Sequence, residues 1–578
     1  MTKSIVRREG VNKAFFNSDS IHPLLLDIYA NRGIASLNDL EKGMEHLIPY
    51  NDLLGIAKAV QCLSDALQKQ QRFLIVGDFD ADGATSTALA VSALQTFGAK
   101  YVDFLVPNRF EYGYGLTPEI VHVAAQKQPD IIITVDNGIN SCAGVTTAKS
   151  LGIKVVITDH HLPGTELPNA DAIVNPNQLG DLFPCKNLAG VGVIFYVMLA
   201  LRTQLRSINW FSQQNIPEPN MAQFLDLVAL GTVADVVPLD KNNRILVFQG
   251  LQRIKSDKGR PGIKALLTIS KRQADRLTAA DLGFAIAPRL NAAGRLDDMS
   301  LGIACLLSTD INVAFEIAQQ LDTLNQERRA IENDMQLQAL AYLEKLKFNN
   351  LNQLPLGLCL FEPEWHQGVI GIIAGRVKDL YHRPVIAFAQ VNEQEIKGSA
   401  RSVNNVHIRD VLEAISTQHP DLLSKFGGHA MAAGLTLPIK NYSLFCKLFD
   451  GEIQKHLCIE DTHGKIMSDG ELASEHLHIS VAQLIRDGGP WGQHFPEPLF
   501  DGYFEIVNQR LIGGKHLKLI LQHPQLKSSI DGIAFGIDLN VWPNSAIKSV
   551  RIAYRLDINE YQGLKNMQLL IEHIEPMT

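Results

Sequence analysis

The sequence predicts an α/β protein: a parallel-sheet domain, a long connecting helix, a second α/β domain and a C-terminal β-barrel. Three observations predict it. Short β-branched runs alternate with helical stretches from residue 73 onward. Residues 303–354 contain neither glycine nor proline, and the tail from about residue 460 reads as short alternating strands between Gly and Asn turns. At 578 residues, the chain is long enough for several such domains.

The first domain is predicted from its succession of strand-like segments, which are FLIVGDFD, VDFLVP, DIIITVD, KVVITDH and ADAIVNP. Helical segments such as ATSTALAVSALQTFG separate them, and this alternation is typical of a doubly wound parallel sheet. In such sheets ligands collect outside the carboxyl ends of the strands. Acidic and imidazole side chains follow these predicted strands, so we expect a site at that edge.

The later elements follow from composition. The stretch LDTLNQERRAIENDMQLQALAYLEKL is rich in strong helix formers, and about 30 helical residues would span roughly 45 Å, long enough to set a cleft between two domains. A second α/β domain is marked by GVIGIIAGR, KGSARS and FGGHAMAAG. The predicted barrel strands are FDGYFEIV, HLKLIL, SIDGIAFGI and SVRIAYRLDINEY. Residues 1–55 form an extension with no assigned role.

Composition narrows the class of protein. Apolar residues make up 46% and charged residues 20%, which is typical of a soluble globular protein. Seven scattered cysteines without a CxxC pair argue against a disulfide framework or a zinc ribbon. The longest apolar run, 188–201, is shorter than the roughly 20 residues of a membrane span, so we expect a cytoplasmic protein. The net charge of −8 excludes a global basic footprint, so any nucleic acid would be held in a local groove.

The chemistry begins with Asp78, Asp80 and Asp82, which follow the first predicted strand. Neighbouring carboxylates raise one another's pKa and destabilise the folded state unless a cation binds them. Asp136 and the Asp159–His161 string follow later strands of the same sheet. Hard oxygen ligands with an imidazole suit Mn²⁺ or Mg²⁺, and two such ions would support phosphoester hydrolysis. A single Asp after a strand is more often a helix N-cap or an Asx turn, but so many on one edge favour metal.

The motifs also carry a resemblance. GDFDADGATS, TVDNGI, TDHH and GTVADVVPLD resemble the successive motifs of the DHH phosphoesterase superfamily. PNRFEYGYGL, LAGVGV, PRLNAAGRLDD, EWHQGVIGIIAGR, GSARS and FGGHAMAAG resemble the bacterial RecJ single-strand-specific 5′ to 3′ exonucleases, over nearly the whole chain. The resemblance implies an N-terminal extension at 1–55, a DHH catalytic domain at 56–310, a connecting helix at 311–350, a DHHA1-like domain at 351–455 and an OB-like domain at 456–578.

Carried over to this chain, the resemblance implies the metal ligands Asp80, Asp82, Asp136, His160 and Asp235. Asp78 is either a further ligand or an outer partner. The expected catalytic pair is Asp159, which orients the histidines, and His161, which faces the scissile phosphate. His161 would either donate to a phosphoryl oxygen or protonate the leaving oxygen. Asp226 rivals Asp235, but Gly231 and the VADVVP segment place Asp235 near an element boundary, which we prefer.

The resemblance also implies substrate contacts. Arg109, Ser399 and Arg401 would hold the 5′-terminal phosphate, although Arg109 alone reads equally well as a solvated loop charge. His429, after two glycines, either contacts a phosphate or packs in a tight turn. Arg289, Asn291 and Arg295 are expected to line the strand path. A second track, or alternatively the barrel core, is offered by Tyr503, Phe504, Arg510, Lys515, His516, Lys518 and Tyr561.

The resulting hypothesis is a two-metal 5′ to 3′ exonuclease that releases mononucleotides from single-stranded DNA. The resemblance implies roles in DNA repair, including mismatch repair, and in recombination, with a single-strand binding protein and a RecQ-type helicase as partners. We expect a monomer that does not associate with membranes. The alternatives are a DHH-type phosphoesterase acting on short oligonucleotides or cyclic dinucleotides, which would lack the barrel, and a non-catalytic replication scaffold, which the intact aspartates and histidines disfavour.

Overall fold

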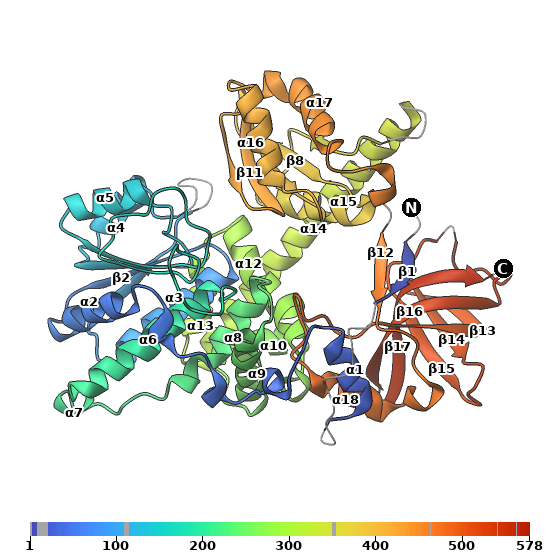
Figure 1. Cartoon of the computed structure of the whole chain (residues 1–578), viewed down its shortest axis with the longest axis horizontal. Helices are drawn as coiled ribbons and strands as arrows, with labels where there is room; N and C mark the ends of the chain where they lie inside the picture. Colours follow the sequence, from blue (N-terminus) through green and yellow to red (C-terminus); the bar gives the residue numbers. More distant parts are fainter. Residues whose placement is uncertain are drawn as a thin grey trace. The chain divides into compact units, whose positions relative to one another are not determined.

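The computed structural model describes residues 3–8, 21–108, 115–349, 354–462, 464–539, 541–561 and 563–577. The chain divides into two compact units (Figure 1). The larger unit contains Arg8–Asn325 and the residues from Asp469 onward, and the smaller contains the residues up to Arg7 and Gln326–Ser468. No helix among the described residues is long and apolar enough to cross a membrane.

The larger unit is built around a five-stranded, wholly parallel sheet, as the sequence predicts. Alternate residues of the central strands enter two cores: Ile75 packs with helices α2, α3 and α6, whereas Leu74 packs with α4 and α5. Both faces are covered, which explains the uninterrupted apolar strand sequences. The strands, in spatial order, are β3 (Val102–Leu105), β2 (Phe73–Gly77), β4 (Ile131–Val135), β5 (Lys154–Thr158) and β6 (Ala172–Val174). The covering helices are α2 (Ile56–Gln68), α3 (Ala81–Thr96), α4 (Pro118–Ala125), α5 (Cys142–Ser150) and α6 (Gly190–Ser207).

A helical region of the same unit follows the sheet. Its π-helical turn, η7 (Leu282–Ile286), runs into an α-helix that has Pro288 in its first turn. Proline has no amide hydrogen and its ring crowds the carbonyl four residues earlier, which accounts for the widened turn before it. The helices are α7 (Trp210–Gln213), α8 (Leu225–Ala234), α9 (Lys241–Lys255), α10 (Pro261–Ile269), α11 (Ala279–Asp281), α12 (Ala287–Leu296) and α13 (Ser300–Leu307).

The C-terminal part of the larger unit is a closed five-stranded barrel, as predicted. Leu517, Leu519 and Leu521 point inward at the period of two expected of a strand. Of the predicted aromatic track, Phe504 is buried in the core, whereas Tyr503 is 44% exposed. The strands, in spatial order, are β13 (Phe500–Ile512), β14 (His516–Gln522), β15 (Ser529–Ala534), β17 (Leu564–Met577) and β16 (Ser549–Tyr561).

Residues 21–55 of the N-terminal extension pack within the larger unit. Helix α1 (Pro23–Ala30) lies against α18 (Ile479–Gly488), where the Tyr29 hydroxyl donates to the Gly488 carbonyl at 2.8 Å. Arg32 forms an ion pair with Asp469 at 3.0 Å, and both side chains are almost fully buried. The extension therefore joins segments that are far apart in the sequence.

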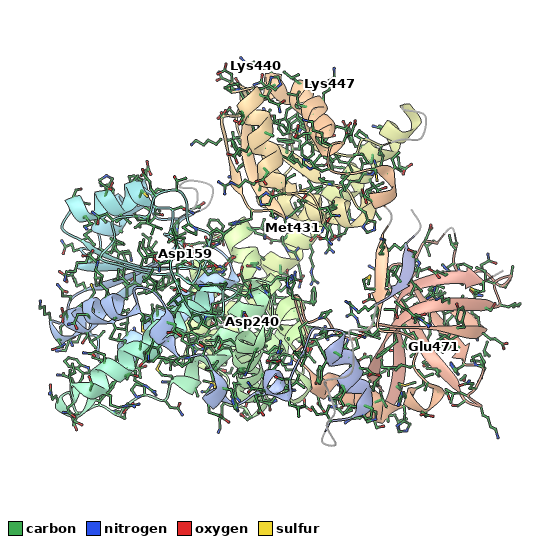
Figure 2. All side chains as sticks on the ribbon, viewed as in Figure 1. Asp159, Asp240, Met431, Lys440, Lys447 and Glu471 are labelled. Carbon is green, nitrogen blue, oxygen red and sulfur yellow. The ribbon has the colours of Figure 1, made fainter. Side chains whose placement is uncertain are left out.

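The smaller unit contains a mixed five-stranded sheet with helices α15 (Ile370–Tyr381), α16 (Ile408–Gln418) and α17 (Tyr442–Ile453). Its strands, in spatial order, are β10 (Lys425–Gly428), β11 (Ala432–Pro438), β9 (Glu395–Arg401), β8 (Val385–Gln390) and β7 (Leu358–Phe361). A separate parallel pair joins β1 (Ser4–Arg7) to β12 (Lys465–Ser468). Figure 2 shows the side chains of both units as sticks on the ribbon. The expected long helix is present as α14 (Ile311–Asn349), and the boundary between the units falls within it.

Candidate metal centre

The candidate site lies at the carboxyl edge of the parallel sheet. Asp78, Asp136 and Asp159 each come directly after the last residue of β2, β4 and β5. The register pairs Gly77 with Val135, and Val135 with Thr158, so the three aspartates leave the sheet side by side. The sequence pattern therefore placed these side chains together through parallel topology alone.

The first loop turns at once into helix α3. Asp80 is its N-cap, and its Oδ1 accepts hydrogen bonds from the backbone N–H of Asp82 at 2.9 Å and of Gly83 at 3.0 Å. Asp80 therefore caps a helix, as an aspartate after a strand often does. It also belongs to the acidic cluster.

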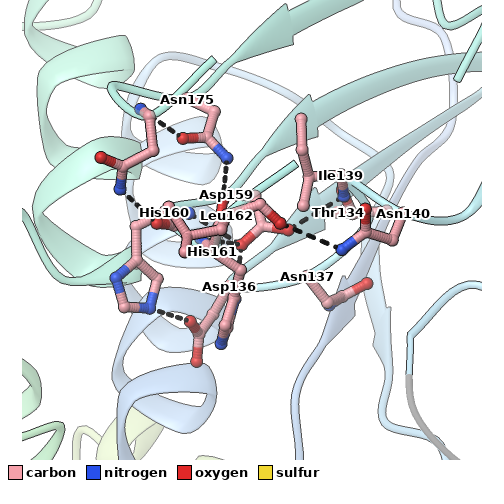
Figure 3. A network of polar contacts seen from close by, with 12 residues as sticks. Thr134, Asp136, Asn137, Ile139, Asn140, Asp159, His160, His161, Leu162 and Asn175 are labelled. Atoms are coloured by element: carbon pink, nitrogen blue, oxygen red, sulfur yellow. Dashed lines mark hydrogen bonds and ion pairs between the residues drawn. The ribbon is translucent and has the colours of Figure 1, made fainter. Parts of the chain in front are cut away.

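His160 lies at the middle of the cluster. Its Nε2 atom is 3.1 Å from Asp136 Oδ1 and 3.5 Å from Asp235 Oδ2, and Figure 3 shows the contact with Asp136. Three overlapping sets of side chains have potential ligand atoms within 4.8 Å of one another. They are Asp136, His160 and His161; Asp82, His160 and Asp235; and Asp78, Asp80 and Asp136. Because the sets share His160 and Asp136, they describe adjacent positions that two cations could occupy.

Three acids of the cluster are difficult to ionise in the folded protein. Burial and then the charges of neighbouring aspartates raise the pKa of Asp136 well above its ordinary value. Burial and the charge of Asp235 raise the pKa of Asp82 to about 7, and burial and the charge of Asp80 raise the pKa of Asp235 to about 8. Folding has gathered acids that ionise poorly without a partner. These donor sets, which are mostly carboxylates with His160 and His161 as the imidazoles, fit Mn²⁺ or Mg²⁺.

Two glycines let the helices approach the cluster. A Cβ atom on Gly190 would lie 2.6 Å from Asp136 Cβ, and one on Gly231 would lie 2.7 Å from Asp82 Oδ1. At the start of α6, the N–H groups of Gly190 and Val191 donate to Asp82 at 2.6 and 3.0 Å. Hydrogen bonding from a helix N-terminus favours the ionised carboxylate, in opposition to burial.

Asp159 and His161 form a hydrogen-bonded pair beside the cluster. Asp159 Oδ1 is 2.7 Å from His161 Nδ1, and its Oδ2 accepts from the Ile139 N–H at 2.9 Å (Figure 3). Burial opposes ionisation of Asp159, but the bond with His161 and the charges of both histidines outweigh it, so the pKa of Asp159 is lowered. Burial likewise opposes the charged form of His161, but the bond and charge of Asp159 raise the pKa of His161 to about 9.

His160 behaves oppositely to its neighbour. Burial, followed by the positive charge of His161, lowers the pKa of His160. A neutral imidazole is the form that binds a metal ion. The two adjacent histidines are thus electrically distinct, with His160 neutral within the acidic cluster and His161 paired with Asp159.

Two asparagines that the sequence analysis did not single out hold the histidine backbone. The side-chain amide of Asn175 donates to the His161 carbonyl at 2.9 Å, and that of Asn177 donates to the His160 carbonyl at 2.6 Å. Both follow strand β6 on the edge that carries the aspartates. In the sequence, the only indication of this role was the string Asn175–Pro176–Asn177 directly after the last predicted strand.

The structure separates Asp235 from its rival Asp226. Asp226 is fully buried, accepts the Arg260 N–H at 2.8 Å and lies 3.3 Å from the Arg260 side chain. Asp235 comes directly after α8 and contributes to a cluster set. Among the described residues, Asp226 is in none of these sets.

The three predicted strand-path residues on α12 have different surroundings. Arg289 is buried and pairs with Asp322 at 2.8 Å. Asn291 Oδ1 accepts the Ala81 N–H at 2.8 Å and so braces the loop that carries Asp80. Arg295 lies near the C-terminal end of α12 and is partly buried.

The predicted phosphate contacts that the structure describes lie in the smaller unit. Arg401 Nη1 donates to Ser399 Oγ at 3.2 Å on β9. A Cβ atom on Gly371, in the first turn of α15, would lie 2.8 Å from Ser399 Oγ and 2.9 Å from Arg401 Nη2. His429 is exposed in the turn between β10 and β11, and Arg109 lies outside the described residues.

Comparisons with known proteins agree with this arrangement. The model for the DHH family, N-terminal domain, matches residues 72–232, so sheet and site define a DHH-type protein. The DHHA1 domain model matches residues 354–455, and the RecJ OB domain model matches residues 468–573. The chain is 52% identical to the single-stranded-DNA-specific exonuclease RecJ of Escherichia coli over 99% of both chains. It therefore belongs to the RecJ family of single-stranded-DNA-specific exonucleases.

Solved structures give the same family. The crystal structure of RecJ from Thermus thermophilus in complex with Mn²⁺ matches with a TM-score of 0.79 and 28% identity, over 96% of this chain and 76% of that chain. The complex of the same protein with Mg²⁺ matches with a TM-score of 0.73 and 26% identity, over 96% and 75% of the two chains. Both matches extend through the sheet and the barrel.

Proposed function

We propose that this protein hydrolyses single-stranded DNA from the 5′ end with the help of two Mn²⁺ or Mg²⁺ ions. The observation that carries the proposal is the overlap of acidic and imidazole sets at one sheet edge. Family membership supports it, since the Escherichia coli relative is a single-stranded-DNA-specific exonuclease and RecJ of Thermus thermophilus was crystallised with either ion.

The chain's own residues would hold the ions. Asp136 and His160 occur in more than one cluster set and are the candidates for ligands near both positions. Asp82 and Asp235 complete one set, and Asp78 and Asp80 complete another. Bound divalent ions lower the pKa of a coordinated water and neutralise charge on the phosphate. Loss of a single carboxylate would therefore weaken the site more than a lost hydrogen bond would.

His161 is the proposed proton donor. Its pKa of about 9 keeps it protonated at neutral pH, and Asp159 fixes its ring through Nδ1. The other ring nitrogen, Nε2, then carries a proton that can be donated to a phosphoryl oxygen or to the leaving oxygen. Asp159 acts through His161, as a positioning residue.

Polarity is proposed to come from a terminal phosphate pocket. Ser399 and Arg401 meet the first turn of α15 at Gly371, which brings a hydroxyl, a guanidinium and a helix N-terminus together. All three favour an anion. Arg109 and His429 would add contacts. Such a pocket fixes the first nucleotide, so that cleavage releases mononucleotides.

Strand contacts beyond the pocket are proposed for Arg295 and the exposed barrel residues, with Asn291 acting through the aspartate loop. We also propose roles in repair and recombination, partnership with a single-strand binding protein and a RecQ-type helicase, a monomeric state and a cytoplasmic location. The barrel and the aligned length favour this function over hydrolysis of short oligonucleotides or cyclic dinucleotides.

The test follows the products of a 3′-labelled, 5′-phosphorylated single strand and of a matched duplex. With Mn²⁺ or Mg²⁺, we expect mononucleotides and progressively shortened labelled strands from the single strand only, and none with EDTA. Products that retain the 5′ end while the 3′ label is lost would contradict the polarity. Equal cleavage of the duplex would contradict the strand specificity.

A further inference from the structure

Two exposed apolar side chains directly follow cluster residues in the chain, and a third lies on a turn that packs against the helix before Asp235. Leu162 follows His161 and is 55% exposed, and Val236 follows Asp235 and is 61% exposed. Phe284, in the π-helical turn η7, is 80% exposed. Single exposed apolar residues are common and need no explanation. Because two of these residues follow cluster residues and the third lies on a turn packed on α8, we treat Leu162, Val236 and Phe284 together and call them the apolar rim.

The turn that carries Phe284 packs against α8, the helix that ends just before Asp235. Gly283, next to Phe284, packs on α8, since a Cβ atom there would lie 3.2 Å from Val233 Cγ1. Val233 is two residues before Asp235. The helix that continues from η7 is fixed to the aspartate loop, where Asn291 accepts the Ala81 N–H and Gly294 meets the Phe79 carbonyl. The turn therefore packs on the helix that precedes Asp235, and the helix that continues from it contacts the loop that carries Asp80.

Val236 has a backbone conformation that costs free energy. Its φ of 62° lies in the left-handed region, where a β-branched residue is a genuine outlier. Strain of this kind is found most often at functional sites. Here it accompanies a side chain that the fold leaves exposed rather than buried.

We propose that the apolar rim contacts the nucleobases next to the scissile phosphate, with Phe284 as the stacking platform. An aromatic face accepts any base, so it would position a strand without selecting its sequence. A base held in a duplex is already stacked and paired, so the platform would favour single strands. The inference rests on the proposed nuclease function and adds positioning residues to it.

The experiment scans a base-free residue along the substrate. A tetrahydrofuran abasic unit replaces each of the first nucleotides of a 5′-phosphorylated strand in turn, and kcat and KM are measured with Mn²⁺ for the wild type and Phe284→Ala. We expect one abasic position to reduce kcat/KM of the wild type by about tenfold, in the range of a lost stacking contact. Phe284→Ala should show a similar loss on the intact strand and no further loss at that position.

Controls separate stacking from a structural effect. Phe284→Trp should restore both the rate and the abasic dependence, which a fold defect would not do. Tyr101→Ala removes another exposed aromatic residue, 52% exposed, from the opposite edge of the sheet, where its carbonyl pairs with the first residue of β2. It should behave as the wild type. Val236→Asn removes the apolar side chain and introduces a residue type that tolerates the left-handed conformation, so it should weaken strand binding while the melting temperature stays the same or rises.

Two results would overturn the inference. One is a Phe284→Ala enzyme that cleaves intact strands as fast as the wild type. The other is a Phe284→Ala enzyme whose kcat/KM falls below that of the wild type by the same factor on every abasic substrate and on the intact strand. If the wild type itself failed to shorten any single strand with Mn²⁺, the proposed function would fall and this inference with it, and the wild-type control identifies that case.

Discussion

The metal centre and the serine–arginine pair have opposite electrostatic designs. In the larger unit, buried carboxylates gather until burial and mutual repulsion raise the pKa of Asp136. In the smaller unit, Arg401 and Ser399 meet a helix N-terminus, and both side chains are only partly buried. The first site concentrates negative charge, as a site for cations does, and the second presents positive charge and donors, as a site for an anion does. The charge of each site is therefore opposite to that of its expected ligand.

The largest effect is expected from Asp136→Ala, which should abolish hydrolysis. Removing a carboxylate that belongs to two cluster sets would empty at least one cation position. The same change relieves repulsion but places alanine at a φ of 62°, which costs free energy, so the metal-free variant should stay folded and melt close to the metal-free wild type. Hydrolysis rates in metal-buffered solution and thermal unfolding measure both. Full activity in this variant would contradict the two-ion mechanism.

A smaller loss is expected from His161→Gln. General acid catalysis is worth roughly a hundred- to ten-thousandfold in rate, and the variant removes the donor while leaving the aspartates in place. We therefore expect kcat to fall by that order with Mn²⁺ affinity nearly retained. Single-turnover cleavage and Mn²⁺ titration give the two numbers. If metal affinity fell as steeply as kcat, His161 would be a ligand rather than a proton donor.

At the anion site, Arg401→Ala should weaken cleavage of 5′-phosphorylated strands by about 1.5–3 kcal/mol, the range of a charge-assisted hydrogen bond. Strands with a 5′-hydroxyl should lose much less, because they offer no terminal charge. Comparison of kcat/KM on the two substrates measures the difference. An equal loss on both would assign Arg401 to the strand path and not to the terminus.

The smallest effect concerns pH and stability. The pKa of Asp82 is raised to about 7 and that of Asp235 to about 8, above ordinary values near 4. An acid with a raised folded-state pKa contributes stability below its unfolded pKa and loses it as pH rises through the folded pKa. The metal-free protein should therefore lose stability between about pH 4 and 8.

Because cations bind the ionised form, the gain in melting temperature on adding Mg²⁺ should be greater at pH 8 than at pH 6. Thermal unfolding across this range, with Asp136→Ala as the control that loses the gain, provides the measurement. A gain independent of pH would mean that the carboxylates are already ionised without metal.

The two sites also differ in how far the sequence predicts them. Asp78, Asp136 and Asp159 follow β2, β4 and β5, which are neighbours in the sheet, and parallel topology brings such positions together. Asp235 comes from a helix end, and its preference over Asp226 rested on a boundary signal, because a buried aspartate paired with Arg260 looks the same in sequence. Ser399 and Gly371 are 28 positions apart, and no local pattern showed that they meet.

Packing explains other limits of the sequence. Phe504 and Tyr503 are neighbours on β13 and face opposite sides, but the sequence left open which aromatic residues fill the barrel. The interaction of Arg289 with Asp322 depends on how α12 packs against α14, a tertiary feature without a sequence period. Residues 21–55 of the extension are held by individual long-range contacts, such as that of Tyr29 with Gly488, which no sequence pattern indicates.

The most direct test of the account counts bound ions. Mn²⁺ bound per chain would be measured by equilibrium dialysis on the full-length protein, with Asp136→Ala and Tyr101→Ala alongside, and each sample assayed for strand hydrolysis. We expect two ions in the wild type and in Tyr101→Ala, fewer in Asp136→Ala, and activity that rises with occupancy of the second ion. Full activity with a single bound ion, or unchanged binding in Asp136→Ala, would contradict the overlapping two-cation centre.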